Sequence, residues 1–218
     1  MLGLIKFSLL MDIKSERILQ QWKVAQSKYK NDYIIIPVLD IIARKFKTYC
    51  AIHEDLIKIK EYLYLIQQTP SKQIKSALCY AIIALYGKFF TDASQSNKPK
   101  LEPSFLFKEE SANQNTHNFL MDLRHNFIAH RGSTINEVEV SYLLIPKPEV
   151  NKQTELKYSQ IKLNSFNHKE TNDIAQLIEY LIEQVKYKIQ KSGDKAKGAM
   201  FEHFTIEQLG ALAINNME

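Results

Sequence analysis

The chain is organised around the ten residues LRHNFIAHRG, which run from Leu123 to Gly132. Two arginines, two histidines and one asparagine surround a single apolar triplet, Phe127 to Ala129. No other segment of the 218-residue sequence places so many chemically active side chains together. We call these ten residues the motif segment and expect both the fold and the function to depend on them.

The spacing within the motif segment predicts the end of a helix. Leu123 and Phe127 are four residues apart and can face a core together. Gly132 stands where a glycine commonly ends a helix, and His130 and Arg131 occupy the last turn, where cations complement the helix dipole. The simplest interpretation of this pattern is a group of solvated cations beside a capping glycine.

A shared site is the alternative interpretation of the same residues. On an α-helix, Asn126 and His130 lie one turn apart on one face, so both can contact one ligand. Arg124 lies about 120° from His130 on the same helix. Arg124 and His130 therefore serve one site only if a cleft wraps the helix, if the helix ends near His130, or if a second chain contributes.

The motif segment resembles the signature of HEPN domains, small α-helical domains named for nucleotide binding in higher eukaryotes and prokaryotes. Arg124 is followed after five residues by His130, with Asn126 between them, although the commonest signature has no residue in the position of His125. The order of residues in the motif segment is most similar to that in HEPN-like proteins of bacterial abortive-infection and defence systems. Their upstream Tyr-x-Arg/Lys-x-Phe element resembles the segment YGKFFT, residues 86–91.

This resemblance implies a fold and a chemistry. The fold is an antiparallel helical bundle in which two motif helices meet across a homodimer. The activity is that of a metal-independent endoribonuclease of a toxin–antitoxin or phage-defence system, in which the 2′-OH attacks the adjacent phosphate. RNA is then the expected partner, an antitoxin protein is a further one, and no cofactor or metal is expected.

The resemblance also implies roles for named residues. Catalysis falls to Arg124 at the phosphate, to Asn126 as an orienting group and to His130 as the proton-transfer group, a task that suits an imidazole at neutral pH. RNA or phosphate binding falls to the remaining candidates, His125, Arg131, Lys88 and Tyr86. Taken alone, Lys88 is also typical of a surface lysine near a helix C-terminus.

Two other functional interpretations remain open. A HEPN-like module without catalysis would bind RNA, a nucleotide or a partner protein through the same cleft, and the inserted His125 favours this alternative. The match with HEPN domains is accidental in the third interpretation. The sequence contains no glycine-rich phosphate loop, no Rossmann fingerprint and no nucleophile elbow, which excludes the commonest nucleotide-dependent enzyme classes. Histidines and carboxylates show no metal-ligand spacing either.

Composition is that of an ordinary globular protein, with 45% hydrophobic and 24% charged residues. The 29 basic and 24 acidic residues give a net charge of +5, which suits a polyanionic partner or a solubilising surface. Cys50 and Cys79 fall in apolar segments and are expected to be free buried thiols. With no signal-peptide pattern and no long uncharged apolar run, we expect a cytoplasmic protein without a membrane span.

The fold class that we predict is mainly α, a helical bundle with a β-hairpin inserted after the motif helix. Residues 1–12 are expected to be an N-terminal extension, with Met1 or Met11 as the natural start. The HEPN-like domain is expected to cover residues 13–192, with the hairpin at about 136–165. Residues 193–218 would form a C-terminal tail with a short docking helix.

Hydrophobic periodicity predicts the individual elements of this domain. Helices are expected at 13–30, from near Pro37 to Gln68 as one helix or two, at 72–90, from about Glu109 to His130, and at 171–190, with residues 192–198 ending the last of them. The helix at 72–90 is apolar all round over its middle and should be central. Alternation predicts the hairpin, which is marginal alone and so should lie against the helices or pair across a dimer, at the rim of the site.

Overall fold

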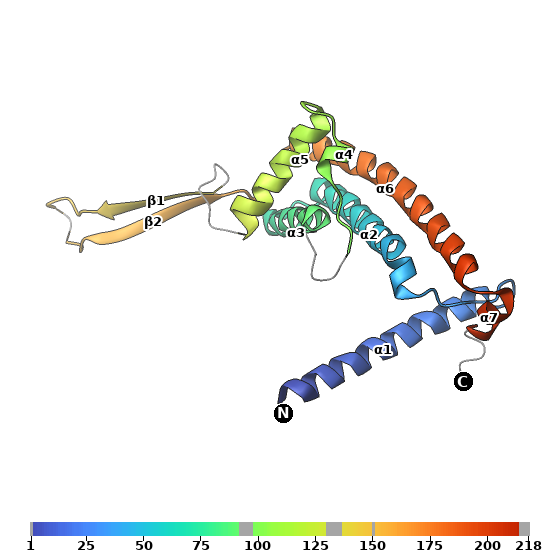
Figure 1. Cartoon of the computed structure of the whole chain (residues 1–218). Coiled ribbons are helices and arrows are strands. Elements are labelled where there is room, and N and C mark those ends of the chain that lie inside the picture. Colours follow the sequence, from blue (N-terminus) through green and yellow to red (C-terminus); the bar gives the residue numbers. More distant parts are fainter. Residues whose placement is uncertain (1, 92–97, 130–136, 150, 214–218) are drawn as a thin grey trace. The chain divides into compact units, whose positions relative to one another are not determined.

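The chain is mainly helical and carries one two-stranded antiparallel sheet, which confirms the predicted fold class at this level (Figure 1). The computed structural model describes residues 2–91, 98–129, 137–149 and 151–213. These residues contain no helix that is long and apolar enough to cross a membrane. The chain divides into two compact units, Lys45–Gln190, here called the central unit, and a second unit formed by Met1–Arg44 with Lys191–Glu218.

The second unit contains the terminal helices α1 (Leu2–Tyr29) and α7 (Ile206–Ala211). Helix α1 begins at Leu2, well before the start that the sequence pattern predicts at Ile13. Helix α7 matches the short helix predicted in the tail, and it begins with a capping box in which Thr205 and Gln208 bond each other's backbone N–H groups.

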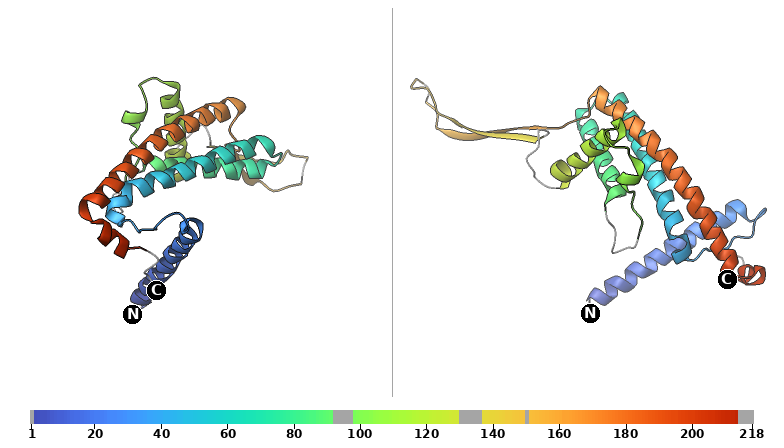
Figure 2. Two further views of the ribbon diagram at one scale, coloured as in Figure 1. Left: turned by 90° about the vertical axis from the view of Figure 1, so that its right-hand side faces the viewer. Right: turned by 45° about the horizontal axis from the view of Figure 1, so that its top comes forward.

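The central unit is built on three long helices, α2 (Asp40–Gln68), α3 (Lys72–Phe90) and α6 (His168–His203). Helix α2 is continuous, so the alternative of one long helix is confirmed over that of two helices. Within the central unit α2 and α6 run antiparallel, because Lys188 lies over the ring of Tyr49 while Lys60 pairs with Glu179 (Figure 2).

Helix α6 starts and ends at points that only partly follow the prediction. Its first turn is capped by Asn167 and Glu170, whose side chains accept hydrogen bonds from each other's backbone N–H groups. The prediction that residues 192–198 end the helix was wrong, since α6 continues to His203. Gly193 and Gly198 weaken a helix by about 1 kcal/mol each but do not remove a backbone donor as proline would.

The predicted bounds of α3 are confirmed at both ends. The helix begins after Pro70-Ser71, where the Ser71 Oγ accepts a hydrogen bond from the backbone N–H of Ile74 at 3.3 Å. It ends at Phe90, and the hydroxyl and N–H of the following residue, Thr91, both bond the carbonyl of Gly87. The helix is not buried all round, because Ala77 and Ala84 remain exposed.

Ser71→Ala is expected to lower the free energy of unfolding by about 1 kcal/mol, the usual cost of losing a serine N-cap. Chemical unfolding of the purified variant measures this loss. Ser104→Ala, an exposed serine without an N-cap role, serves as the control. An Ser71→Ala variant as stable as the wild type would contradict the capping role.

The core of the central unit joins these helices to the segment that carries the motif. Its members are aliphatic and aromatic side chains that are almost completely removed from solvent. The most deeply buried aliphatic ones are Leu56, Ile59, Ile82, Ile83, Leu101, Leu120, Leu123, Ile174, Leu177, Ile178, Leu181 and Val185.

The motif segment arrives through two short helices, α4 (Pro103–Leu106) and α5 (Ala112–Asp122). Ser111 caps α5 by accepting a hydrogen bond from the N–H of Gln114 at 3.2 Å. After Asp122 the backbone widens into a π-helix, η2 (Leu123–Ala129). The single α-helix predicted from Glu109 to His130 is therefore replaced by an α-helix and a π-helical turn over the described residues.

The predicted hairpin is confirmed as β1 (Glu137–Leu144) and β2 (Glu155–Lys162), paired antiparallel from Glu137 with Lys162 to Leu144 with Glu155. Only Glu137 and Gln160 are partly shielded from solvent. Apolar residues such as Val140 and Tyr158 are more than half exposed. The hairpin therefore does not lie along the helices, which excludes the first of the two expected ways of stabilising it.

Candidate functional site

The described part of the motif segment forms the π-helix η2, which packs against α3. A π-helix forms i→i+5 hydrogen bonds, and such turns are frequent at functional sites. The α-helical angle of about 120° between Arg124 and His130 therefore does not apply to this backbone. His130, Arg131 and Gly132 lie outside the described residues, so the predictions for them stay predictions.

Arg124 packs directly on Gly87 of α3. A Cβ atom at position 87 would overlap the Cγ of Arg124 and would lie 3.0 Å from its Cδ, so only glycine leaves room for this side chain. Arg124 is half-buried, and its guanidinium has no hydrogen-bond or ion-pair partner among the described residues. The two sequence elements that carry the family resemblance therefore meet in space, at Gly87 and Arg124.

Tyr86 is predicted to contact RNA, but the structure places it in the core. Its side chain is fully buried, and its hydroxyl forms a 2.8 Å hydrogen bond with the Nδ1 of His117. Burial raises the pKa of Tyr86 and lowers the pKa of His117 to about 4, so His117 is neutral near pH 7 and can accept this bond. Tyr86 thus supports the fold beside Arg124 and is not accessible to a ligand outside.

His117 is not among the candidate residues that the sequence indicates, and its hydrogen bond with Tyr86 was not expected. The His117 ring packs against Phe90 and Phe107, with ring centroids 4.5 and 4.9 Å away. The available sequence signal was its spacing of three residues from Leu120, which places both side chains on the core face of α5. Nothing in the pattern linked His117 to Tyr86.

Lys88 is engaged in an ion pair that the sequence did not indicate. Its Nζ lies 2.6 Å from the Oδ2 of Asp55 on α2, while 66% of the lysine side chain remains exposed. An exposed pair of this kind contributes about 0–1 kcal/mol to stability. Asp55 neutralises part of the positive field that Lys88 was expected to supply.

Asn126 and His125 differ in their surroundings. Asn126 is half-buried and donates a 2.6 Å hydrogen bond from Nδ2 to the Oδ1 of Asp122, whereas His125 is exposed. Asp122 was missed, although its spacing of four residues from Asn126 is the pattern of neighbours on a helix. Its carboxylate would repel a phosphate placed beside Asn126 while leaving the amide oxygen of Asn126 able to accept a bond.

The residues that the structure describes contain no group of three or more histidine, cysteine or carboxylate side chains able to hold a metal ion. Within the same residues, the polar side chains of η2 and the group bonded to them are the Arg124 guanidinium, the Asn126–Asp122 pair and the exposed His125 ring. This arrangement offers one cation with no described counter-ion and two groups that can hydrogen-bond. Such a set can bind and orient an anion such as a phosphate.

Comparison of the chain with protein-family models, with curated proteins and with solved structures gave no match.

Proposed function

We propose that the chain is a HEPN-like, metal-independent endoribonuclease of a toxin–antitoxin or phage-defence system, with the central unit as its helical domain. The observation that carries the proposal is the contact between Arg124 and Gly87. The motif segment and the upstream YGKFFT segment together carry the resemblance to HEPN domains, and contact between them is what a shared site requires.

Arg124 is the group best placed for the phosphate in this proposal. Arginine presents a rigid fork of donors that matches phosphate oxygens, and the guanidinium here has no partner among the described residues. RNA carries its own nucleophile in the 2′-OH, so cleavage requires a proton acceptor, a proton donor and a cation near the developing charge. His130 would exchange the protons, and Asn126 would orient the phosphate or the imidazole.

A homodimer is part of the same proposal. Two motif segments that meet across a two-fold axis would let the arginine of one chain face the histidine of the other. This would hold whatever angle separates the two side chains around their own helix. The shared cleft would then contain two copies of each catalytic residue. An antitoxin would act by covering this cleft.

A binding module without catalysis is the second candidate, and two observations favour it. The Asp122 carboxylate beside Asn126 weakens the electrostatic attraction between the site and a phosphate. Tyr86 is buried in the core and cannot contact a ligand in the site. Such a module would bind RNA, a nucleotide or a partner protein through the same surface.

An RNA-cleavage assay in the presence of EDTA separates the two candidates. Wild-type protein is compared with Arg124→Ala and His130→Ala, and Lys58→Ala, an exposed lysine on α2, is the matched control for lost charge. Cleavage by the wild type and the control that is lost in both site variants supports the ribonuclease, and a solution mass of two chains supports the shared cleft. Wild-type protein that binds diverse RNAs and cuts none of them contradicts the ribonuclease and leaves the binding module.

A further inference from the structure

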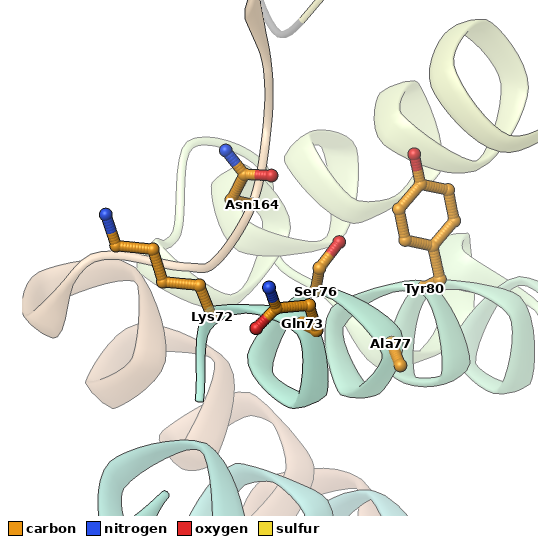
Figure 3. A pocket seen from close by; sticks show the side chains of 6 residues that line it. All are labelled: Lys72, Gln73, Ser76, Ala77, Tyr80 and Asn164. Atoms are coloured by element: carbon orange, nitrogen blue, oxygen red, sulfur yellow. The ribbon is translucent and has the colours of Figure 1, made fainter. Parts of the chain in front are cut away.

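An open pocket lies on α3, two turns from the contact between Gly87 and Arg124. Its volume is about 550 Å³, within the range of small-ligand pockets. Five of its lining residues come from the first half of α3, and the sixth, Asn164, comes from the connection between β2 and α6. Figure 3 shows Asn164 opposite Gln73 and Ser76, with Lys72 and Tyr80 at the two ends. No motif in the sequence indicates this pocket.

The lining of the pocket has a defined chemistry. It offers one ammonium group, from Lys72, two amides, from Gln73 and Asn164, the hydroxyl of Ser76 and the phenol ring of Tyr80. None of the six lining residues is acidic, and no carboxylate among the described residues pairs with Lys72. Amides bond the edges of nucleobases, aromatic rings stack on bases, and an ammonium group attracts phosphate.

The pocket is connected to the motif segment through Tyr80. Its ring lies 5.1 Å from the ring of Phe127 in η2, centroid to centroid. Tyr80 and Gly87 are seven residues apart on α3, which places them on one stripe of the helix, roughly 10 Å apart along its axis. The pocket and Arg124 therefore lie along the same side of α3.

The base of the hairpin adjoins the same pocket. Lys162, the last residue of β2, pairs with Glu137 at 2.6 Å, and this bond, with a smaller contribution from the nearby Tyr80, raises the pKa of Lys162. Because Glu137 offsets the charge of Lys162, Lys72 is the cation that the pocket presents to a ligand. The base of the hairpin therefore lies beside the pocket, and its Lys162–Glu137 pair adds no net negative charge that would repel an anion.

We propose that this pocket binds one nucleotide of a single-stranded RNA, with the base beside Tyr80 and the phosphate beside Lys72. The inference rests on the proposed function and deepens it, since it names unpaired RNA as the substrate and places a flanking nucleotide two helical turns from the reacting phosphate. An unpaired strand is favoured because a base in a duplex has to give up its pairing and stacking before it can enter the pocket.

The test measures binding separately from cleavage. The probe is a short, fluorescently labelled, single-stranded oligoribonucleotide of mixed sequence, 2′-O-methylated so that it lacks the nucleophile for cleavage. Two pocket variants are titrated, Lys72→Ala/Asn164→Ala, which changes exposed residues, and Tyr80→Leu, which removes the ring. Lys58→Ala/Gln67→Ala removes one charge and one amide from exposed positions of α2 and is the matched control. Circular dichroism verifies that each variant is folded.

Both pocket variants are expected to bind the probe about 10-fold more weakly or worse, with the control unchanged. Wild-type affinity in both pocket variants would overturn the proposal, as would wild-type protein that binds no RNA. Equal competition by free nucleoside monophosphates would also overturn it, because the pocket would then be a mononucleotide site.

The two proposals fail in different ways. Cleavage that depends on Arg124 and His130, together with pocket variants of unchanged affinity, would overturn the pocket and keep the ribonuclease. Binding that depends on the pocket, in a protein that cuts no RNA, would overturn the ribonuclease and keep the pocket.

Discussion

Gly87→Ala is expected to lower the rate of RNA cleavage by about 10²- to 10³-fold, the loss typical of removing one donor to the transition state. The new Cβ would occupy the place of the Arg124 Cγ, so the arginine side chain has to leave its position. Alanine favours a helix by about 0.5–1 kcal/mol over glycine, which offsets part of the local strain and keeps α3 folded. Single-turnover cleavage in EDTA, with a thermal unfolding curve, measures both effects.

Two comparisons make the Gly87 result specific. Gly198→Ala in α6 is the control, because a Cβ at position 198 meets no atom within 4 Å, and its cleavage rate should equal that of the wild type. The double variant Gly87→Ala/Arg124→Ala should be no slower than Arg124→Ala, since both changes remove the same group. A Gly87→Ala enzyme of full activity would show that the observed position of Arg124 is not the functional one.

The free energy of unfolding of the central unit is expected to fall by on the order of 2–3 kcal/mol as the pH falls from about 6.5 to about 4. The pKa of His117 is lowered to about 4 by burial, whereas an unfolded histidine titrates near 6.5. Between these values the unfolded chain binds the proton and the folded chain does not, so acid favours unfolding. The stability that the neutral, buried His117 contributes is fully present above about pH 6.5 and lost below about pH 4.

Urea unfolding at several pH values across this window measures the loss. The variant Tyr86→Phe/His117→Phe replaces both hydrogen-bonding partners with apolar rings, which costs little near pH 7 and removes the titrating group. Its stability should therefore vary less with pH than that of the wild type. His117→Phe alone leaves the buried Tyr86 hydroxyl without its partner and should cost about 1–3 kcal/mol near pH 7. An identical pH dependence in wild type and double variant would refute the assignment to His117.

Local patterns were sufficient for several elements of the fold. The bounds of α3 were predicted from hydrophobic periodicity and an uninterrupted apolar run, patterns that act within a few residues. The hairpin followed from alternation of apolar and polar side chains. The same method failed at the end of α6, because glycine was taken as a stop where the backbone hydrogen bonds continue.

The candidate site could be predicted in its residue types and only partly in its geometry. Arg124 and Asn126 were identified by their spacing, but the angles assigned to them assumed an α-helix where the structure has a π-helix. Asp122 and Asp55, which partner Asn126 and Lys88, had no motif of their own. Tyr86 was predicted to contact a ligand because it is the first residue of the YGKFFT segment. The structure buries it instead, because its exposure depends on how α5 packs on α3.

The sequence by itself determined which segments are helix or strand, since propensity, capping and hydrophobic period act between residues a few positions apart. Only the tertiary structure decided that Tyr86 bonds His117, thirty-one positions along the chain, and that Gly87 makes room for Arg124. It also brought Asn164 over α3 to form the pocket. These contacts join elements whose mutual placement depends on the packing of the whole core, and no periodicity within one element records that packing.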